Sequence, residues 1–101
     1  MSIIRGTTPT IEFVLPFGTD YLVEGFVTIC QRGKVVIDKP LAACRCDANK
    51  LTVKLTQAET LALVCNCDVE IQIRARTADG EAVASNIMRE SAERILKDGV
   101  I

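Results

Sequence analysis

The chain of 101 residues and 11.0 kDa is long enough for one domain that buries well over half of its unfolded surface without disulfides or metals. Its 49% of hydrophobic and 25% of charged residues are typical of a soluble globular protein rather than a disordered or fibrous one. Twelve basic and thirteen acidic residues nearly cancel, and like charges never cluster. Because a phosphate-binding face needs clustered positive charge, we expect no nucleic-acid partner.

The opening sequence MSIIRGTTPT contains Arg5 and lacks the apolar run of a signal peptide. No segment approaches the ~20 apolar residues of a membrane-spanning helix. We therefore expect no secretion by a signal peptide and no membrane partner. Five cysteines, an odd number, then indicate reduced thiols rather than a disulfide framework.

Alternation of apolar and polar residues predicts strands through the first half of the chain. Ile11, Phe13 and Leu15 alternate with residues that face the other way, and a proline stands on each side of this segment. A glycine turn at 32–34 separates two segments rich in β-branched residues, which predicts a β-hairpin. The predicted strands are residues 8–16, 21–31, 35–41 and 50–55.

A short helix is expected near residues 57–64, where the period of the sequence changes. Thr56 is followed three residues later by Glu59, which is the capping-box pattern of a helix start. We expect Leu61 and Val64 to dock this helix on the core.

The clearest predicted strand is 68–77, in which every second residue is apolar. The dipeptide Asp79-Gly80 then supplies a tight turn that returns the chain along this strand. Residues 86–97 are ambiguous, because their apolar residues also share one face at helical spacing. Since strand 68–77 would otherwise lack a partner, we expect a strand to about residue 92, followed by a tail of different character.

About seven short strands with one helix near 57–64 predict an all-β fold, an immunoglobulin-like antiparallel β-sandwich, as a single domain over 1–101. A true immunoglobulin domain is less expected, because the chain has no tryptophan. Residues 1–8 and 97–101 fall outside the strand pattern and are predicted to form an N-terminal arm and a C-terminal tail. The arm and the tail carry four apolar residues: Ile3, Ile4, Val100 and Ile101.

Two Cys-x-Cys pairs resemble a chemical site: Cys44, Cys46, Cys65 and Cys67. Four thiolates could hold one zinc ion in tetrahedral geometry. However, a strand at 50–55 rises by about 20 Å and would keep the pairs near opposite ends of the sandwich, although a helix at 57–64 could fold back by about 12 Å. We therefore favour inert packing of free thiols and expect no metal ligand. A zinc site or a redox role remains the alternative.

The chain contains no histidine, so the commonest general base and metal ligand is missing. The segment GKVVIDK lacks the glycine spacing and the terminal Lys-Ser/Thr of a phosphate-binding loop. We accordingly predict no catalytic residue, no cofactor and no small-molecule substrate.

Four stretches carry a resemblance to a family: RGTTPTIEFVLPF, KLTVKLTQAETL, VEIQIRART with the DGEAVASN that follows, and RILKDGVI. Together they resemble small uncharacterised prophage-encoded structural proteins of Gram-positive bacteria, over nearly the whole chain. The resemblance implies a β-sandwich module of a tail or baseplate, made in the bacterial cytoplasm and then part of the virion. It also implies a non-enzymatic structural or assembly role through contacts with other phage structural proteins or with itself. The arm 1–8, the tail 97–101 or a sheet edge would make these contacts by strand addition.

Overall fold

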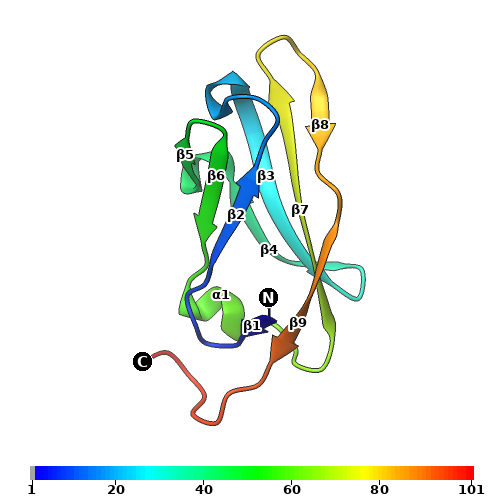
Figure 1. Ribbon diagram of the computed structural model, residues 1–101. Helices are drawn as coiled ribbons and strands as arrows, with labels where there is room; N and C mark the ends of the chain where they lie inside the picture. Colours follow the sequence, from blue (N-terminus) through cyan, green and yellow to red (C-terminus); the bar gives the residue numbers. More distant parts are fainter. Residues whose placement is uncertain (1) are drawn as a thin grey trace.

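The computed structural model describes residues 2–101, which form an all-β fold of nine strands in two sheets (Figure 1). The strands are β1 (Ser2–Ile4), β2 (Thr10–Val14), β3 (Leu22–Gln31), β4 (Lys34–Pro40), β5 (Arg45–Asp47), β6 (Lys50–Lys54), β7 (Asp68–Thr77), β8 (Ala82–Ala84) and β9 (Met88–Glu93). One sheet has the order β1-β9-β7-β3-β4, with β8 also paired to β7, and the other has the order β2-β6-β5. Two short 3-10 helices, η1 (Thr19–Tyr21) and η2 (Leu41–Ala43), lie in the connections.

The core lies between the two sheets and is built from alternate residues of their strands. In β6, Leu51 and Val53 are buried, while the lysines at both ends of the strand are exposed. In β7, four apolar side chains face the core at every second position: Val69, Ile71, Ile73 and Ala75. The alternation of the sequence thus correctly predicted both strands and their buried faces.

The predicted turns are confirmed at both hairpins. Between β3 and β4, Arg32 and Gly33 have positive φ angles of 51° and 77°. Between β7 and β8, Gly80 has a φ of 87°, in a region that glycine enters without steric cost. Each turn reverses the chain within a few residues, so consecutive strands pair antiparallel.

The predicted helix is present as α1 (Gln57–Leu61), and its capping box is formed. The Thr56 hydroxyl accepts from the Glu59 amide at 3.1 Å, and the Glu59 carboxylate accepts from the Thr56 amide at 2.8 Å. The helix ends three residues earlier than predicted, because the Val64 amide bonds to the side chain of Gln31 instead of a helix carbonyl. The predicted docking residues are therefore wrong: Thr60 and Leu63 are buried, whereas Leu61 is only partly buried and Val64 is half-exposed.

An ion pair fixes α1 to β4. The Lys39 ammonium lies 3.0 Å from both carboxylate oxygens of Glu59, and both side chains are mostly buried. Partial burial raises the pKa of Glu59, but the hydrogen bond from the Thr56 amide and the ammonium of Lys39 together outweigh it and lower that pKa below its ordinary value. The carboxylate therefore stabilises the helix start in its ionised form.

Within the ambiguous segment 86–97, Met88–Glu93 form the strand β9, so the helical spacing does not form a helix. β9 pairs antiparallel with β7, and a break after β8 separates the two strands that return along β7. At this break the Ser85 amide still donates to the Ile73 carbonyl at 2.9 Å. Pairing with the otherwise unpaired edge of β7 therefore outweighed the helical periodicity of the segment.

The prediction that residues 1–8 form an arm outside the sheets is wrong for Ser2–Ile4, which form β1. This strand pairs in parallel with β9, with Ile3 opposite Ala92, and the Ile3 side chain is completely buried. The sheet is therefore mixed rather than purely antiparallel. A three-residue strand shows no periodicity that the sequence could reveal, and burial of Ile3 stabilises its pairing. Met1, the first residue of the predicted arm, lies outside the described residues.

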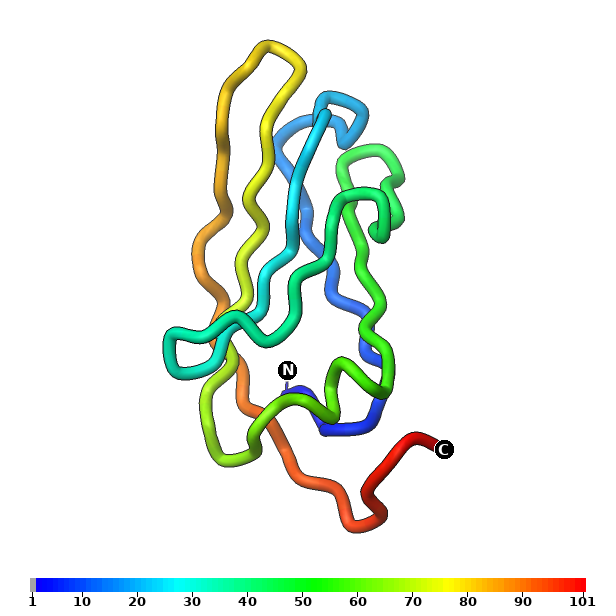
Figure 2. The backbone as a smooth tube through the Cα atoms, turned by 180° about the vertical axis from the view of Figure 1, so that it is seen from behind, coloured from blue at the N-terminus to red at the C-terminus, as the bar shows by residue number. Residues whose placement is uncertain are grey.

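The segment 94–101 follows β9 without regular secondary structure and crosses beneath the sandwich toward α1 (Figure 2). Its last residue is held by the side-chain amide of Gln57, which donates to the Ile101 carbonyl at 3.1 Å and accepts from the Ile101 amide at 2.8 Å. Within residues 2–101, no helix has the length and apolar content that crossing a bilayer requires.

Candidate interaction cleft

Within residues 2–101, β2 and β8 each have one edge with no neighbouring strand, as do the outer strands β1, β4 and β5. β2 ends the order of the smaller sheet and pairs only with β6, and β8 pairs only with β7. The prolines on either side of β2 are consistent with this position, because proline within a sheet is confined to edges and strand ends. The free edges of β2 and β8 belong to different sheets.

The hydrogen bonds of these strands show which backbone groups face the opening. Leu15 donates to Asn49 at 2.8 Å and Leu55 donates to Pro9 at 3.0 Å, so the odd-numbered residues of β2 bond to β6. Because bonding alternates along an antiparallel pair, the backbone groups of Glu12 in the middle of β2 point away from β6. A further strand could therefore add to this edge without displacing an existing bond.

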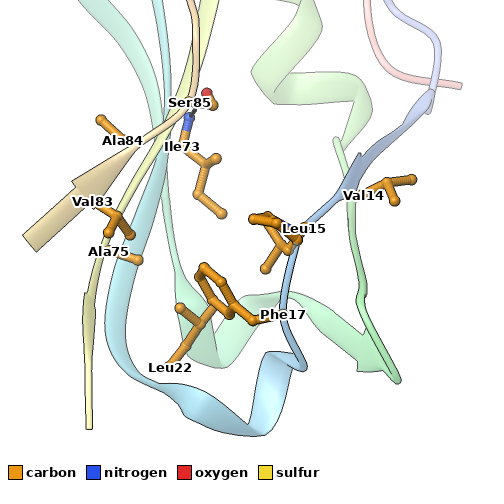
Figure 3. A pocket seen from close by; sticks show the side chains of 10 residues that line it. Val14, Leu15, Phe17, Leu22, Ile73, Ala75, Val83, Ala84 and Ser85 are labelled. Atoms are coloured by element: carbon orange, nitrogen blue, oxygen red, sulfur yellow. Dashed lines mark hydrogen bonds between the residues drawn. The ribbon is translucent and has the colours of Figure 1, made fainter. Parts of the chain in front are cut away.

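A cleft of about 310 Å³ lies between these edges (Figure 3). The side chains of Leu15, Phe17 and Leu22 line one wall, and Ile73 and Val83 line the other. The full lining consists of nine apolar residues and one serine: Val14, Leu15, Pro16, Phe17, Leu22, Ile73, Ala75, Val83, Ala84 and Ser85. The Val14 side chain points away from the cleft and is 64% exposed.

The wall at Phe17 is held by contacts between η1 and the β7–β8 turn. The Phe17 ring packs edge-on against Tyr21 with ring centroids 5.7 Å apart, and the Tyr21 carbonyl accepts from the Ala78 amide at 2.8 Å. Asp79 accepts hydrogen bonds from the hydroxyls of Thr77 and Tyr21. These bonds lower the pKa of Asp79 and raise the pKa of Tyr21, so the carboxylate and the phenol hold each other in place. These contacts connect the wall at Phe17 to η1 and to the β7–β8 turn.

The chemistry that the cleft offers is apolar contact and backbone pairing. Its only side-chain hydroxyl, on Ser85, already accepts from the Ile73 amide at 3.1 Å and donates to the Asn86 carbonyl at 3.0 Å. Every other lining side chain is apolar, which suits the alternate apolar side chains of an extended peptide.

The two Cys-x-Cys pairs are not brought together. Cys46 lies in β5 beside Leu51, while Cys65 and Cys67 lie in the loop between α1 and β7, at the opposite end of the molecule (Figure 1). Within residues 2–101, no three cysteine, aspartate or glutamate side chains are grouped so that they could hold a metal ion. All five thiols are free.

Cys44 of the first pair is also a poor source of thiolate. Burial raises the pKa of Cys44, the neighbouring Cys46 raises it further, and Lys39 opposes these effects only in part. The Cys44 thiol donates to the Pro40 carbonyl at 3.5 Å. A protonated thiol in this position serves as a small packing group rather than as a ligand.

The cleft was not predicted from the sequence, although its parts were. Leu15 belongs to a predicted strand, Phe17 to a predicted turn, and Val83 to the predicted returning strand. The prolines at 9 and 16 were the available signal, because they indicate an edge strand. Which strand would face that edge depends on the packing of the two sheets.

Scans of family models, of curated proteins and of solved structures each gave no match to this chain.

Proposed function

We propose that this chain is a non-enzymatic structural or assembly protein of a phage particle, encoded by a prophage, that acts through protein–protein contacts. The resemblance carried by its four sequence stretches supports the phage setting. The proposal also includes an immunoglobulin-like arrangement of the sandwich. The protein would be made in the bacterial cytoplasm and then incorporated into the virion.

The observation that carries the proposed interaction role is the apolar cleft between two unpaired strand edges. Such an opening accepts an extended segment of a partner, whose backbone pairs with a free edge while alternate side chains enter the cleft. The wall at Phe17 is fixed by its contact with Tyr21, so little ordering would be needed on binding. A partner with exposed apolar side chains on an extended chain therefore fits the site best.

The alternative on Cys44, Cys46, Cys65 and Cys67, a thiolate metal or redox module, gains no support from the geometry. The pairs lie at opposite ends of the molecule, and the pKa of Cys44 is raised rather than lowered. A thiolate site would need the two pairs close together and a lowered pKa at Cys44.

The proposal can be tested in a lysogen that carries the gene. Phage particles are induced, purified on a density gradient and probed with an antibody against this chain. We expect the chain in the particle fraction, and particles that lack it would refute the phage role. Val83→Glu places a charge in the cleft and should abolish incorporation. Val35→Glu makes the same change at a residue that is 61% exposed on β4, and should be incorporated normally.

A further inference from the structure

The tail, residues 94–101, carries apolar side chains that the chain itself does not cover. Leu96 is 92% exposed, Ile101 is 91% exposed and Val100 is 66% exposed. The contact with Gln57 uses only backbone atoms of Ile101, so it leaves these side chains in water. Two such nearly bare apolar residues on one short segment are a feature that a partner surface would explain.

The cleft and the tail lie at opposite ends of an elongated molecule. The principal extents are 47 × 26 × 18 Å, and the two views place the β7–β8 turn and the β2–β3 connection at one end and the tail at the other (Figures 1 and 2). In a head-to-tail arrangement of copies, the end that carries the tail would therefore face the end that carries the cleft of the next copy.

The charges at the two ends are complementary. The turns beside the cleft carry three acidic residues: Asp20, Asp79 and Glu81. The tail carries two basic residues, Arg94 and Lys97, and one acidic residue, Asp98, so its side chains keep a net charge of one positive unit when Asp98 leaves Arg5, from which it lies 3.7 Å away. The two arginines of β7 are on the outer face of the sheet, where Arg76 pairs with Glu24 at 3.2 Å. The acidic rim is thus suited to the basic residues of a tail.

The dimensions of the two parts also agree. Eight residues in extended form span about 26 Å, which exceeds the roughly 17 Å of the five-residue β2 edge. The cleft volume of about 310 Å³ accommodates a few aliphatic side chains, and an extended tail presents Leu96 and Val100 on one face and Ile101 on the other. An added tail strand would pair with backbone groups that face the opening.

We infer that the occupant of the cleft is the tail, residues 94–101, of a second copy of this chain. This inference deepens the proposed function by naming the partner as the chain itself. Because the cleft and the tail are different surfaces, the contact is heterologous, and successive copies add head to tail into a ring or an open filament. Release of the Gln57–Ile101 bonds and of the Arg5–Asp98 ion pair frees the tail for this exchange.

Sedimentation velocity of the full chain under reducing conditions tests the inference. We expect the average mass of the native chain to rise with concentration toward the millimolar range. Val83→Glu in the cleft and Leu96→Asp in the tail should each weaken association at least tenfold. Val35→Glu should associate like the native chain. A native chain that stays monomeric at every concentration, or a Val35→Glu variant as impaired as Val83→Glu, would overturn the inference.

A mixing experiment separates head-to-tail contact from other modes of association. The Val83→Glu chain retains an intact tail and the Leu96→Asp chain retains an intact cleft. An equimolar mixture should therefore form a two-chain species and nothing larger, because both remaining surfaces are blocked. A mixture that stays monomeric, or that forms long assemblies, contradicts the model.

Folding of each variant is checked by thermal unfolding followed by circular dichroism. If Val83→Glu does not fold, a synthetic peptide of residues 94–101 replaces it: in excess it should dissociate the native assembly, and no effect would overturn the inference. Failure of this inference can be distinguished from failure of the proposed function. A monomeric chain that is nevertheless present in purified particles refutes the self-association alone, whereas a self-associating chain absent from particles refutes the phage role alone.

Discussion

Replacing Gln31 by methionine should destabilise the protein much more than the same change at Gln57. Both side-chain amides make the same paired contact with one backbone residue. Gln31 donates to the Val64 carbonyl at 2.7 Å and accepts from the Val64 amide at 2.8 Å, with a longer bond of 3.4 Å to the Cys67 carbonyl. Gln31 is only 5% exposed, whereas Gln57 binds the exposed Ile101. Burial is therefore the main difference between the two sites.

The magnitude follows from the count of bonds. Each hydrogen bond contributes about 0.5–1.5 kcal/mol net, so losing the two short bonds of Gln31 should lower the free energy of unfolding by about 1–3 kcal/mol. Methionine keeps the length of the side chain and leaves no large cavity. At Gln57 water replaces the lost bonds, and we expect a change below about 0.5 kcal/mol. For a domain of this size, 2 kcal/mol corresponds to a melting-temperature shift of roughly 8–16 °C.

The assay is urea unfolding of Gln31→Met, Gln57→Met and the native chain, with a reductant present because all five thiols are free. Hydrogen exchange of the Val64 amide provides a local readout, since its protection depends on the side-chain oxygen Oε1 of Gln31. Equal stabilities of the two variants, or unchanged protection of the Val64 amide in Gln31→Met, would refute the reasoning.

The pKa of Glu59 is lowered in the folded chain. Its ionised carboxylate therefore contributes fully to the free energy of unfolding above the ordinary pKa of 4.5, and this contribution is lost as the pH falls through the pKa of the folded chain. Glu59→Gln should therefore cost about 0.5–1 kcal/mol in urea titrations at neutral pH and less in acid, and Lys39→Met should reduce this pH dependence; equal costs at both pH values contradict the assignment. Gly6→Ala should lower the free energy of unfolding by about 1–3 kcal/mol, because φ is +77° and the new Cβ would lie 2.8 Å from the terminal methyl of Ile95, which must move aside. Gly33 shares that φ but has open space, so Gly33→Ala should cost only about 1 kcal/mol, and equal melting curves of the two variants would exclude the steric effect. Protein purified without chelator should contain far less than one zinc ion per chain by elemental analysis, and a full equivalent that disappears on replacing the four paired cysteines by serine would restore the thiolate alternative.

Local patterns predicted the elements of this fold well where one face of a strand is buried. Alternation in β6 and β7 identified both strands and their inward residues, and the Thr56–Glu59 pair identified the start of α1. Each of these signals is contained within a few residues, so it survives without knowledge of the tertiary structure.

The features that the sequence could not predict depend on partners that are distant in the chain. Ile3 is buried because β1 finds β9, almost the whole chain away. Gln31 is buried because its amide meets the loop at Val64, which also ends α1 early. The cleft likewise requires the edges of β2 and β8, which belong to different sheets. Only the prolines beside β2 indicated locally that its edge would be free.

The parallel pairing of β1 with β9 has a consequence for synthesis on the ribosome. The first strand leaves the exit tunnel early but meets its partner only after residues 91–93 have emerged. Until then, the Ile3 side chain stays exposed, and the sheet edge that receives it does not exist. Closure of this end of the sandwich therefore waits until residues 91–93 are available, and it carries the entropy cost of closing a long loop. A nascent chain stalled before residue 91 should be sensitive to proteases near β1.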